Sequence, residues 1–183
     1  GASAGAMNAA VLANGLLDGG NDGAREALSD FWSRVSEAGA LSSLGQTLLS
    51  WTPGGIALQM LARSASPHQL NPLDLNPLRN LLEETIDFDR LRGNRRIRLL
   101  ISATNVHTGS PRIFRTRELS SDVLLASACL PQIHRAVEID GCYYWDGGFT
   151  ANPAIMPLIE KGRTKDVVVV HIDTQGRQDV PTT

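Results

Sequence analysis

The chain has 183 residues, 42% of them hydrophobic, and a formal net charge of −2. This length suffices for one globular domain with its own core, and the nearly neutral charge gives no indication of nucleic-acid binding. The two cysteines, Cys129 and Cys142, lack metal-ligand spacing and are too few for a disulfide framework. The sequence therefore predicts no metal site and no cofactor.

The first five residues, Gly1-Ala2-Ser3-Ala4-Gly5, contain the pattern Gly-x-Ser-x-Gly. This pattern is typical of a nucleophile elbow, a sharp turn in which a serine connects a strand to a helix. Gly1 and Gly5 are expected on either side because the two backbones approach each other there. The breaker-free residues that follow predict a helix, which places Ser3 at its positive end, where unsatisfied N–H groups can face a developing oxyanion. The alternative is a Gly/Ala-rich helix start in which Ser3 is only the N-cap.

The chain is predicted to be helical up to about residue 96. A loop at 18–21 separates the elbow helix from a second helix over 22–39, whose apolar residues recur with the spacing of one buried face. From about 40 to 96, leucine-rich pieces are interrupted by prolines, and Asn76-Pro77 predicts one helix start. We interpret this segment as a cap-like insertion over an active site. The alternative is a set of helices that simply cover a sheet.

The second half of the chain alternates strand and helix patterns. Strands are predicted at 97–103, 112–116, 137–139, 142–145 and 166–172, and helices at 122–129 and 152–161. Asp140-Gly141 is a strong signal for a tight hairpin turn between two of these strands. The alternation predicts an α/β fold, with helices layered on a mostly parallel sheet.

A candidate general base follows one predicted strand, in the stretch Trp145-Asp146-Gly147-Gly148. Two glycines after an aspartate let the backbone pass close to a neighbouring segment, because no Cβ stands in the way. The plainer interpretation is that Asp-Gly-Gly forms an ordinary turn.

Together these blocks resemble the patatin-like phospholipase family, whose hydrolases use a Ser–Asp dyad. The matching blocks follow the family's order: Gly1 to Ala6, Ser102-Ala103-Thr104-Asn105 with Thr108-Gly109, Ala126-Ser127-Ala128-Cys129-Leu130-Pro131, Asp140-Gly141 with Asp146-Gly147-Gly148, and Asn152-Pro153. The resemblance covers most of the chain outside 18–96. Asn105 departs from the family's pattern, which has an aspartate at that position.

The resemblance implies a three-layer patatin-like fold, with helices on both faces of a mostly parallel central sheet. By resemblance, Ser3 is the acylated nucleophile and Asp146 the general base, while Gly147 and Gly148 support the aspartate motif. The family's glycine-rich oxyanion loop lies upstream of its serine, and no such loop precedes Ser3 here. Only the Ala4 N–H is then a candidate oxyanion donor. We expect that the domain lacks its N-terminal strand and this loop, and that these 183 residues alone are inactive.

The implied function is a lipid acyl ester hydrolase of phospholipase A or lysophospholipase type, built as a single catalytic domain over 1–183. Its substrate would be a phospholipid or another acyl-ester lipid, met by the apolar segment 40–75 and by arginines between 90 and 117. Peripheral membrane association follows as an expectation, with a cytoplasmic or membrane-peripheral location. The sequence indicates no oligomeric state.

Three alternatives stay open. An α/β-hydrolase triad of Ser3, Asp146 and His171 would have the chain order of that fold, although His171 lies in a valine-rich run typical of a strand interior. A non-catalytic patatin-fold module would bind lipid or a protein partner instead. Acyl transfer to an acceptor other than water would use the same chemistry at Ser3.

Overall fold

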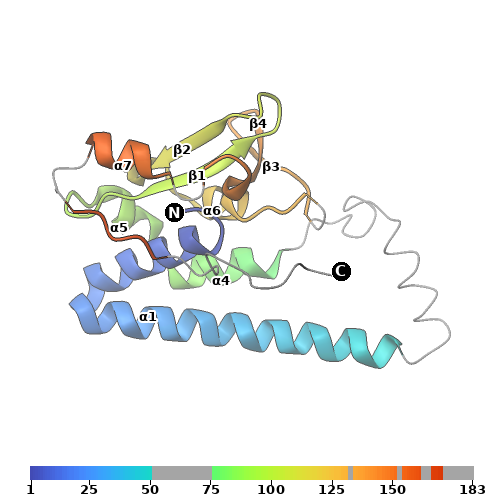
Figure 1. Cartoon of the computed structure of the whole chain (residues 1–183). Coiled ribbons are helices and arrows are strands. Elements are labelled where there is room, and N and C mark those ends of the chain that lie inside the picture. The colour runs from blue at the N-terminus through green and yellow to red at the C-terminus, as the bar shows by residue number, and fades with distance from the viewer. Residues whose placement is uncertain (51–75, 132–133, 152–153, 162–165, 171–183) are drawn as a thin grey trace, which may run out of the picture.

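The computed structural model describes residues 1–50, 76–131, 134–151, 154–161 and 166–170, which form a mixed α/β fold (Figure 1). Much of the predicted cap-like insertion, at 51–75, lies outside the described residues. So do His68, His171 and the predicted helix start at Asn152-Pro153.

One layer of the fold is an antiparallel sheet with the strand order β2-β1-β4-β3. Its strands are β1 (Leu100–Asn105), β2 (Pro111–Arg115), β3 (Val137–Ile139) and β4 (Cys142–Asp146). Four of the predicted strands are thereby confirmed, although β1 begins at Leu100 rather than at residue 97. All three pairings are antiparallel, in contrast to the mostly parallel sheet that the sequence predicted. Two of these pairings are hairpins, whose short connections permit only antiparallel strands.

The hairpin of β3 and β4 turns at Asp140-Gly141, as predicted. Both residues have positive φ, 50° at Asp140 and 74° at Gly141. A two-residue type I′ turn needs positive φ at both central positions, and its twist matches that of the flanking strands. This turn sets the register of β3 against β4, in which Ile139 lies opposite Cys142. On its other side β4 pairs with β1, and Asp146 at the end of β4 lies opposite Ala103.

Helix α1 (Ala4–Ser50) consists of two arms joined at a kink (Figure 1). The kink falls at Gly19 and Gly20, where the backbone is not helical, so the predicted loop at 18–21 is confirmed as a sharp bend. The two arms contact each other at Gly15, before the kink, and Gly23, after it. A Cβ on Gly15 would stand 2.4 Å from the Gly23 carbonyl oxygen. The second arm does not end at residue 39 as predicted. It continues to Ser50, since an interior glycine weakens a helix without necessarily ending it.

Two further helices pack between α1 and the sheet. Helix α6 (Ser121–Ser127) contacts β1, β3 and β4, and α4 (Pro77–Thr85) packs on α6 and α1. Side-chain caps define their starts: Asn76 Oδ1 accepts from the Leu78 N–H of α4, and Ser120 Oγ accepts from the Val123 N–H of α6. The start of α4 at Asn76-Pro77 was predicted, and α6 begins one residue before the predicted residue 122. The largest fully buried side chains form the core between these layers: Phe31, Leu82, Leu91, Ile101, Leu119, Leu124, Val11 and Val123.

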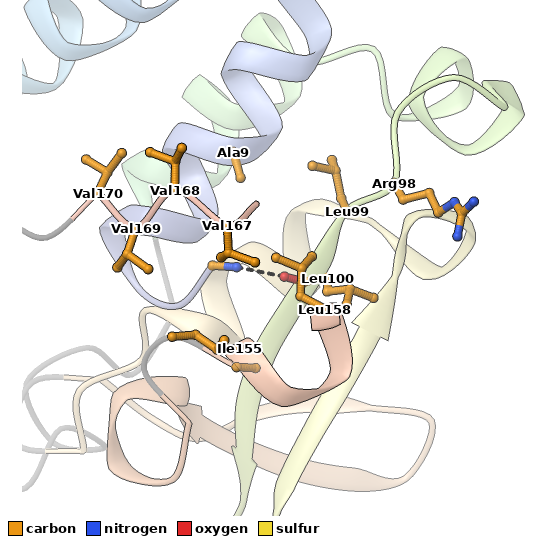
Figure 2. A pocket seen from close by; sticks show the side chains of 12 residues that line it. Ala9, Arg98, Leu99, Leu100, Ile155, Leu158, Val167, Val168, Val169 and Val170 are labelled. Carbon is orange, nitrogen blue, oxygen red and sulfur yellow. Dashed lines mark hydrogen bonds between the residues drawn. The ribbon is translucent and has the colours of Figure 1, made fainter. Parts of the chain in front are cut away.

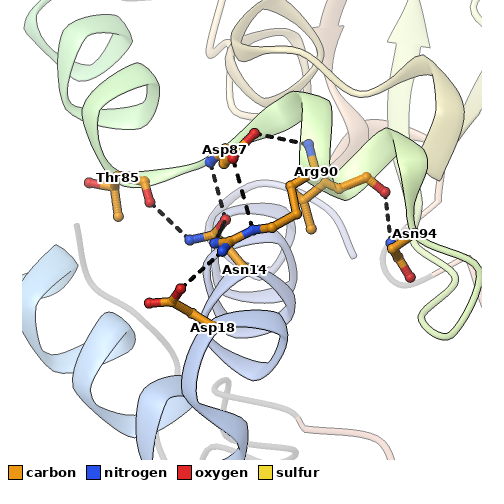
Figure 3. A network of polar contacts seen from close by, with 7 residues as sticks. Asn14, Asp18, Thr85, Asp87, Arg90 and Asn94 are labelled. Atoms are coloured by element: carbon orange, nitrogen blue, oxygen red, sulfur yellow. Dashed lines mark hydrogen bonds and ion pairs between the residues drawn. The ribbon is translucent and has the colours of Figure 1, made fainter.

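A partly buried polar network joins the first arm of α1 to α4 and to α5 (Phe88–Gly93) (Figure 3). Asn14 donates to the Thr85 carbonyl oxygen and accepts from the Asp87 N–H, each at 3.1 Å, and from the Arg90 guanidinium at 3.0 Å. Arg90 also pairs with Asp18 at 2.9 Å. The arm that begins at Ser3 is therefore held by polar contacts as well as by the core.

The last predicted strand, 166–172, is wrong for the part that the structure describes. Residues 166–170 adopt no regular secondary structure, and Val168 and Val170 are each 88% exposed. A β-branched run favours a strand only where an open sheet edge pairs with it, and none of the strands described here does so. Helix α7 (Ile155–Lys161) precedes this segment and confirms the described part of the helix predicted at 152–161.

Candidate active site

Ser3 turns the chain into α1 with a left-handed backbone, at φ 52°. A residue with a Cβ adopts this conformation rarely, and keeps it only where the surrounding structure holds it. Its carbonyl oxygen accepts from the Ala6 N–H at 2.9 Å and the Met7 N–H at 3.3 Å, which starts the helix. A strained turn at the start of a helix is the geometry expected of a nucleophile elbow.

The two glycines of the elbow differ in what they allow. A Cβ on Gly1 would stand 2.4 Å from the Gly5 carbonyl oxygen, so the predicted close approach is confirmed there. A Cβ on Gly5 would meet nothing within 4 Å. The expectation that Gly5 must also be small for steric reasons is therefore wrong, because Gly5 lies on the exposed side of the helix start.

Gly1 lies beside β1 as a residue of a parallel strand would. Its amino group donates to the Leu100 carbonyl oxygen at 2.7 Å, and its carbonyl oxygen accepts from the Ser102 N–H at 3.0 Å. In a parallel pair, a residue bonds to the two residues that flank its partner on the neighbouring strand. Gly1 bonds in this way to Leu100 and Ser102, on either side of Ile101. The elbow is thus attached to the sheet immediately before Ser3.

Asp146 ends β4 and is 4% exposed. Its backbone is held on both sides, because its N–H donates to the Cys129 carbonyl oxygen and its own carbonyl oxygen accepts from Thr104 Oγ1, each at 2.8 Å. Its Oδ1 accepts from the Gly148 N–H at 2.6 Å. Within the described part of the chain, Oδ2 accepts no hydrogen bond.

Gly147 and Gly148 serve the aspartate in different ways. A Cβ on Gly147 would stand 2.2 Å from the Ser102 carbonyl oxygen, so the predicted close approach is confirmed, and the segment approached is β1. Gly148 is exposed and contributes its N–H to Asp146 Oδ1. The turn therefore allows the end of β4 to pack closely on β1, and it orients the Asp146 carboxylate.

Ser3 and Asp146 are attached to the same two stretches of backbone. The Ser3 N–H donates to Ser127, at the end of α6, and Asp146 bonds to Cys129 just beyond it. On β1, Ser102 bonds to Gly1 and its neighbour Ala103 pairs with Asp146. Among the described residues no hydrogen bond joins Ser3 Oγ to the Asp146 carboxylate. Such bonds often tighten only when substrate is bound.

The hydroxyls that hold this arrangement were not singled out as functional from the sequence. Ser102, Thr104 and Ser127 are buried, and each donates a hydrogen bond to a main-chain carbonyl oxygen. The available signal was their place in two of the matched blocks, on β1 and at the end of α6. Small hydroxyl residues in otherwise apolar stretches indicate buried polar contacts.

The aromatic residues around Asp146 point in different directions. Tyr144 lies two residues earlier in β4 and shares the face of Asp146. It is buried, packs edge-on against Phe114 at 5.4 Å between ring centroids, and has its phenol pKa raised mainly by burial. Trp145 projects from the opposite face, and Phe149 is 56% exposed. Of the three, only Tyr144 lies where it can keep water from the aspartate side of the sheet.

An apolar cavity of about 260 Å³ lies beside the elbow, between the first arm of α1, β1, α7 and residues 167–170 (Figure 2). Its lining includes Ala9, Leu99, Leu100, Ile155 and Leu158. Neither Ser3 nor Asp146 lines it, so it is separate from the two candidate catalytic side chains.

The family model for patatin-like phospholipases matches residues 1–159. The chain belongs to the patatin-like phospholipase family. The match includes the elbow, the whole sheet and the Asp146 turn, and a search among curated proteins finds no match. Family membership supports lipid hydrolysis as the reaction class.

The departure from the patatin pattern at Asn105 keeps the turn intact. Asn105 Oδ1 accepts from the N–H groups of His107 and Thr108, each at 3.0 Å. An aspartate oxygen makes the same kind of turn, because both side chains present an acceptor at the same distance from the backbone.

The remaining site expectations for this patatin domain lie partly outside the described residues. His107 and His134 are exposed, and the triad partner His171 is not described. Three of the arginines expected to meet lipid headgroups already pair with the chain's own carboxylates: Arg90 with Asp18, Arg92 with Asp89 and Arg112 with Glu118. Over the described ranges, no cluster of three His, Cys, Asp or Glu residues suits a metal ion, and no helix is apolar and long enough to cross a bilayer.

Proposed function

We propose that residues 1–183 form a single catalytic domain of a lipid acyl hydrolase, with Ser3 as nucleophile and Asp146 as general base. The observation that carries this proposal is the joint attachment of a left-handed Ser3 and a buried Asp146 to Ser102–Ala103 and to the end of α6. Membership of the patatin-like family supports the reaction class.

In the proposed reaction, Ser3 Oγ forms a bond to the acyl carbonyl carbon and passes its proton to Asp146 Oδ2. The tetrahedral oxyanion accepts a hydrogen bond from the Ala4 N–H, one of the first helical N–H groups that have no intrahelical acceptor. Collapse of the intermediate breaks the ester bond, and the leaving alcohol takes the proton from Asp146. Water then attacks the acyl-enzyme by the same route and releases the fatty acid.

The substrate class is a phospholipid or another acyl-ester lipid, and we propose peripheral association with the membrane that contains it. The finer fold expectation, helices on both faces of a mostly parallel central sheet, belongs to this proposal as well. The parallel hydrogen-bond pattern of Gly1 beside Ile101 supports it.

The test is labelling of the full-length protein with a fluorophosphonate probe, together with hydrolysis of a short-chain acyl ester. Ser3→Ala should abolish labelling, and Asp146→Asn should lower turnover by at least about 100-fold, the usual contribution of a positioned base. His171→Ala should leave both readouts unchanged, with His107→Ala as the control for an exposed histidine.

Each alternative predicts a different outcome. Loss of turnover in His171→Ala would favour the triad, whereas an unlabelled wild-type protein would favour a non-catalytic module. Labelling with transfer of the acyl group to an added alcohol, and little free fatty acid, would favour an acyltransferase.

A further inference from the structure

Ser127 lies at the junction between the elbow and the sheet. It is the last residue of α6 and is 0% exposed. Its hydroxyl donates to the Ser102 carbonyl oxygen of β1 at 2.7 Å and accepts from the Ser3 N–H at 3.0 Å. The Ser127 carbonyl oxygen accepts from the same N–H, also at 3.0 Å. One buried residue therefore joins the backbone of Ser3 to the strand beside Asp146.

The double acceptor restricts the conformation of Ser3. The φ angle of a residue sets the direction of its N–H relative to its Cα substituents. The hydroxyl and carbonyl oxygens of Ser127 together restrict the direction of the Ser3 N–H more than one acceptor would. Ser3 has φ 52°, a conformation that persists only when neighbouring groups hold it. Alanine at 127 would retain the carbonyl acceptor and lose the hydroxyl, so the Ser3 N–H would stay paired but less constrained.

The same residue is close to the attachment of Asp146. The Cys129 carbonyl oxygen, two residues after Ser127, accepts from the Asp146 N–H at 2.8 Å. The Ser102 carbonyl oxygen that accepts from Ser127 is the one against which Gly147 packs. Loss of the Ser127 hydroxyl would therefore change the position of Ser3 relative to Asp146. The two residues would not move together as one unit.

We propose that Ser127 is a positioning residue, whose buried hydroxyl holds Ser3 in the conformation from which Oγ attacks the ester. This inference rests on the proposed role of Ser3. Ser127 makes no contact with substrate in this proposal and acts only through the Ser3 backbone.

The first test compares kcat and KM for a short-chain acyl ester in the full-length protein. Ser127→Ala should lower kcat about 10- to 100-fold, as expected for a slightly misplaced reacting group, with KM within about twofold of wild type. Ser127→Cys, which retains a weaker donor and acceptor, should give an intermediate kcat. Ser121→Ala is the matched control, because it removes a buried hydroxyl from the same helix whose partners are Glu83 and Arg79, and its kcat should not change.

The second test does not depend on activity. Hydrogen exchange of the Ser3 amide, followed by NMR, should be faster in Ser127→Ala than in wild type and in Ser121→Ala. If Ser3→Ala keeps full activity, the proposed function fails, while the exchange rate still reports on the hydrogen bond from the Ser3 N–H to Ser127 Oγ.

An unchanged kcat, an effect on KM alone, or an unchanged exchange rate in Ser127→Ala would overturn the positioning role. If Ser127→Ala does not fold, the same criteria apply to Ser127→Cys.

Discussion

Gly147 packs so closely on Ser102 that an ideal Cβ at residue 147 would stand 2.2 Å from the Ser102 carbonyl oxygen. The contact involves main chain on both sides, so no side-chain rotation can relieve it. This approach is what brings the end of β4 onto β1 and fixes the place of Asp146.

Gly147→Ala should therefore lower the free energy of unfolding by about 2–3 kcal/mol, as overpacking of a close contact does. It should also slow fluorophosphonate labelling, because the Asp146 turn must move. Gly93→Ala is the control, since a Cβ there would meet nothing within 4 Å. Urea unfolding measures both variants, and equal stability of the two would show that the Gly147 contact relaxes without cost.

Asn14 makes three hydrogen bonds between the elbow arm of α1 and the α4–α5 connection (Figure 3). Asn14→Ala should cost about 2 kcal/mol or more, because the Thr85 carbonyl and the Asp87 N–H lose their partner in a partly buried place. Asp18→Ala removes an ion pair to Arg90 from a side chain that is 73% exposed, and should cost less than about 1 kcal/mol. Chemical denaturation should rank the variants in that order.

Asn105 tests whether the departure from the family pattern has consequences. Asn105→Asp should leave the free energy of unfolding within about 0.5 kcal/mol of wild type, because a carboxylate oxygen can accept the same two N–H bonds. Asn105→Ala should cost about 1 kcal/mol through loss of both bonds. Thermal unfolding measures the stability of both variants. A larger loss of stability for Asn105→Asp than for Asn105→Ala would contradict the prediction.

The raised pKa of the Tyr144 phenol predicts a pH dependence of stability. Burial favours the neutral phenol in the folded chain, and the neighbouring Cys142 thiol adds to the shift. The stabilisation is complete below the unfolded pKa of about 10 and is lost as the pH rises above it. Tyr144→Phe should therefore unfold at a urea concentration that depends less on pH between about 9 and 11. A parallel pH dependence in wild type and variant would contradict this.

The sequence by itself determined the features that depend on a few neighbouring residues. The elbow pattern around Ser3, the cap at Asn76 and the hairpin turn at Asp140-Gly141 were predicted because each is a local choice of φ, cap or turn. The order of the matched blocks was likewise sufficient to indicate the family. None of these inferences requires knowledge of which distant segments meet.

Only the tertiary structure decided which segments pair and which small residues are required. Residues 167–170 have strand-forming side chains but pair with none of the described strands, because a strand needs an edge that local sequence cannot supply. Gly1 faces a carbonyl oxygen whereas Gly5 faces open space, although the pattern treats them alike. Ser127 bonds to Ser3, 124 positions away in the chain, and to Ser102, 25 positions away. Sequence spacing could not reveal these contacts, since hydrogen bonds depend on position in space.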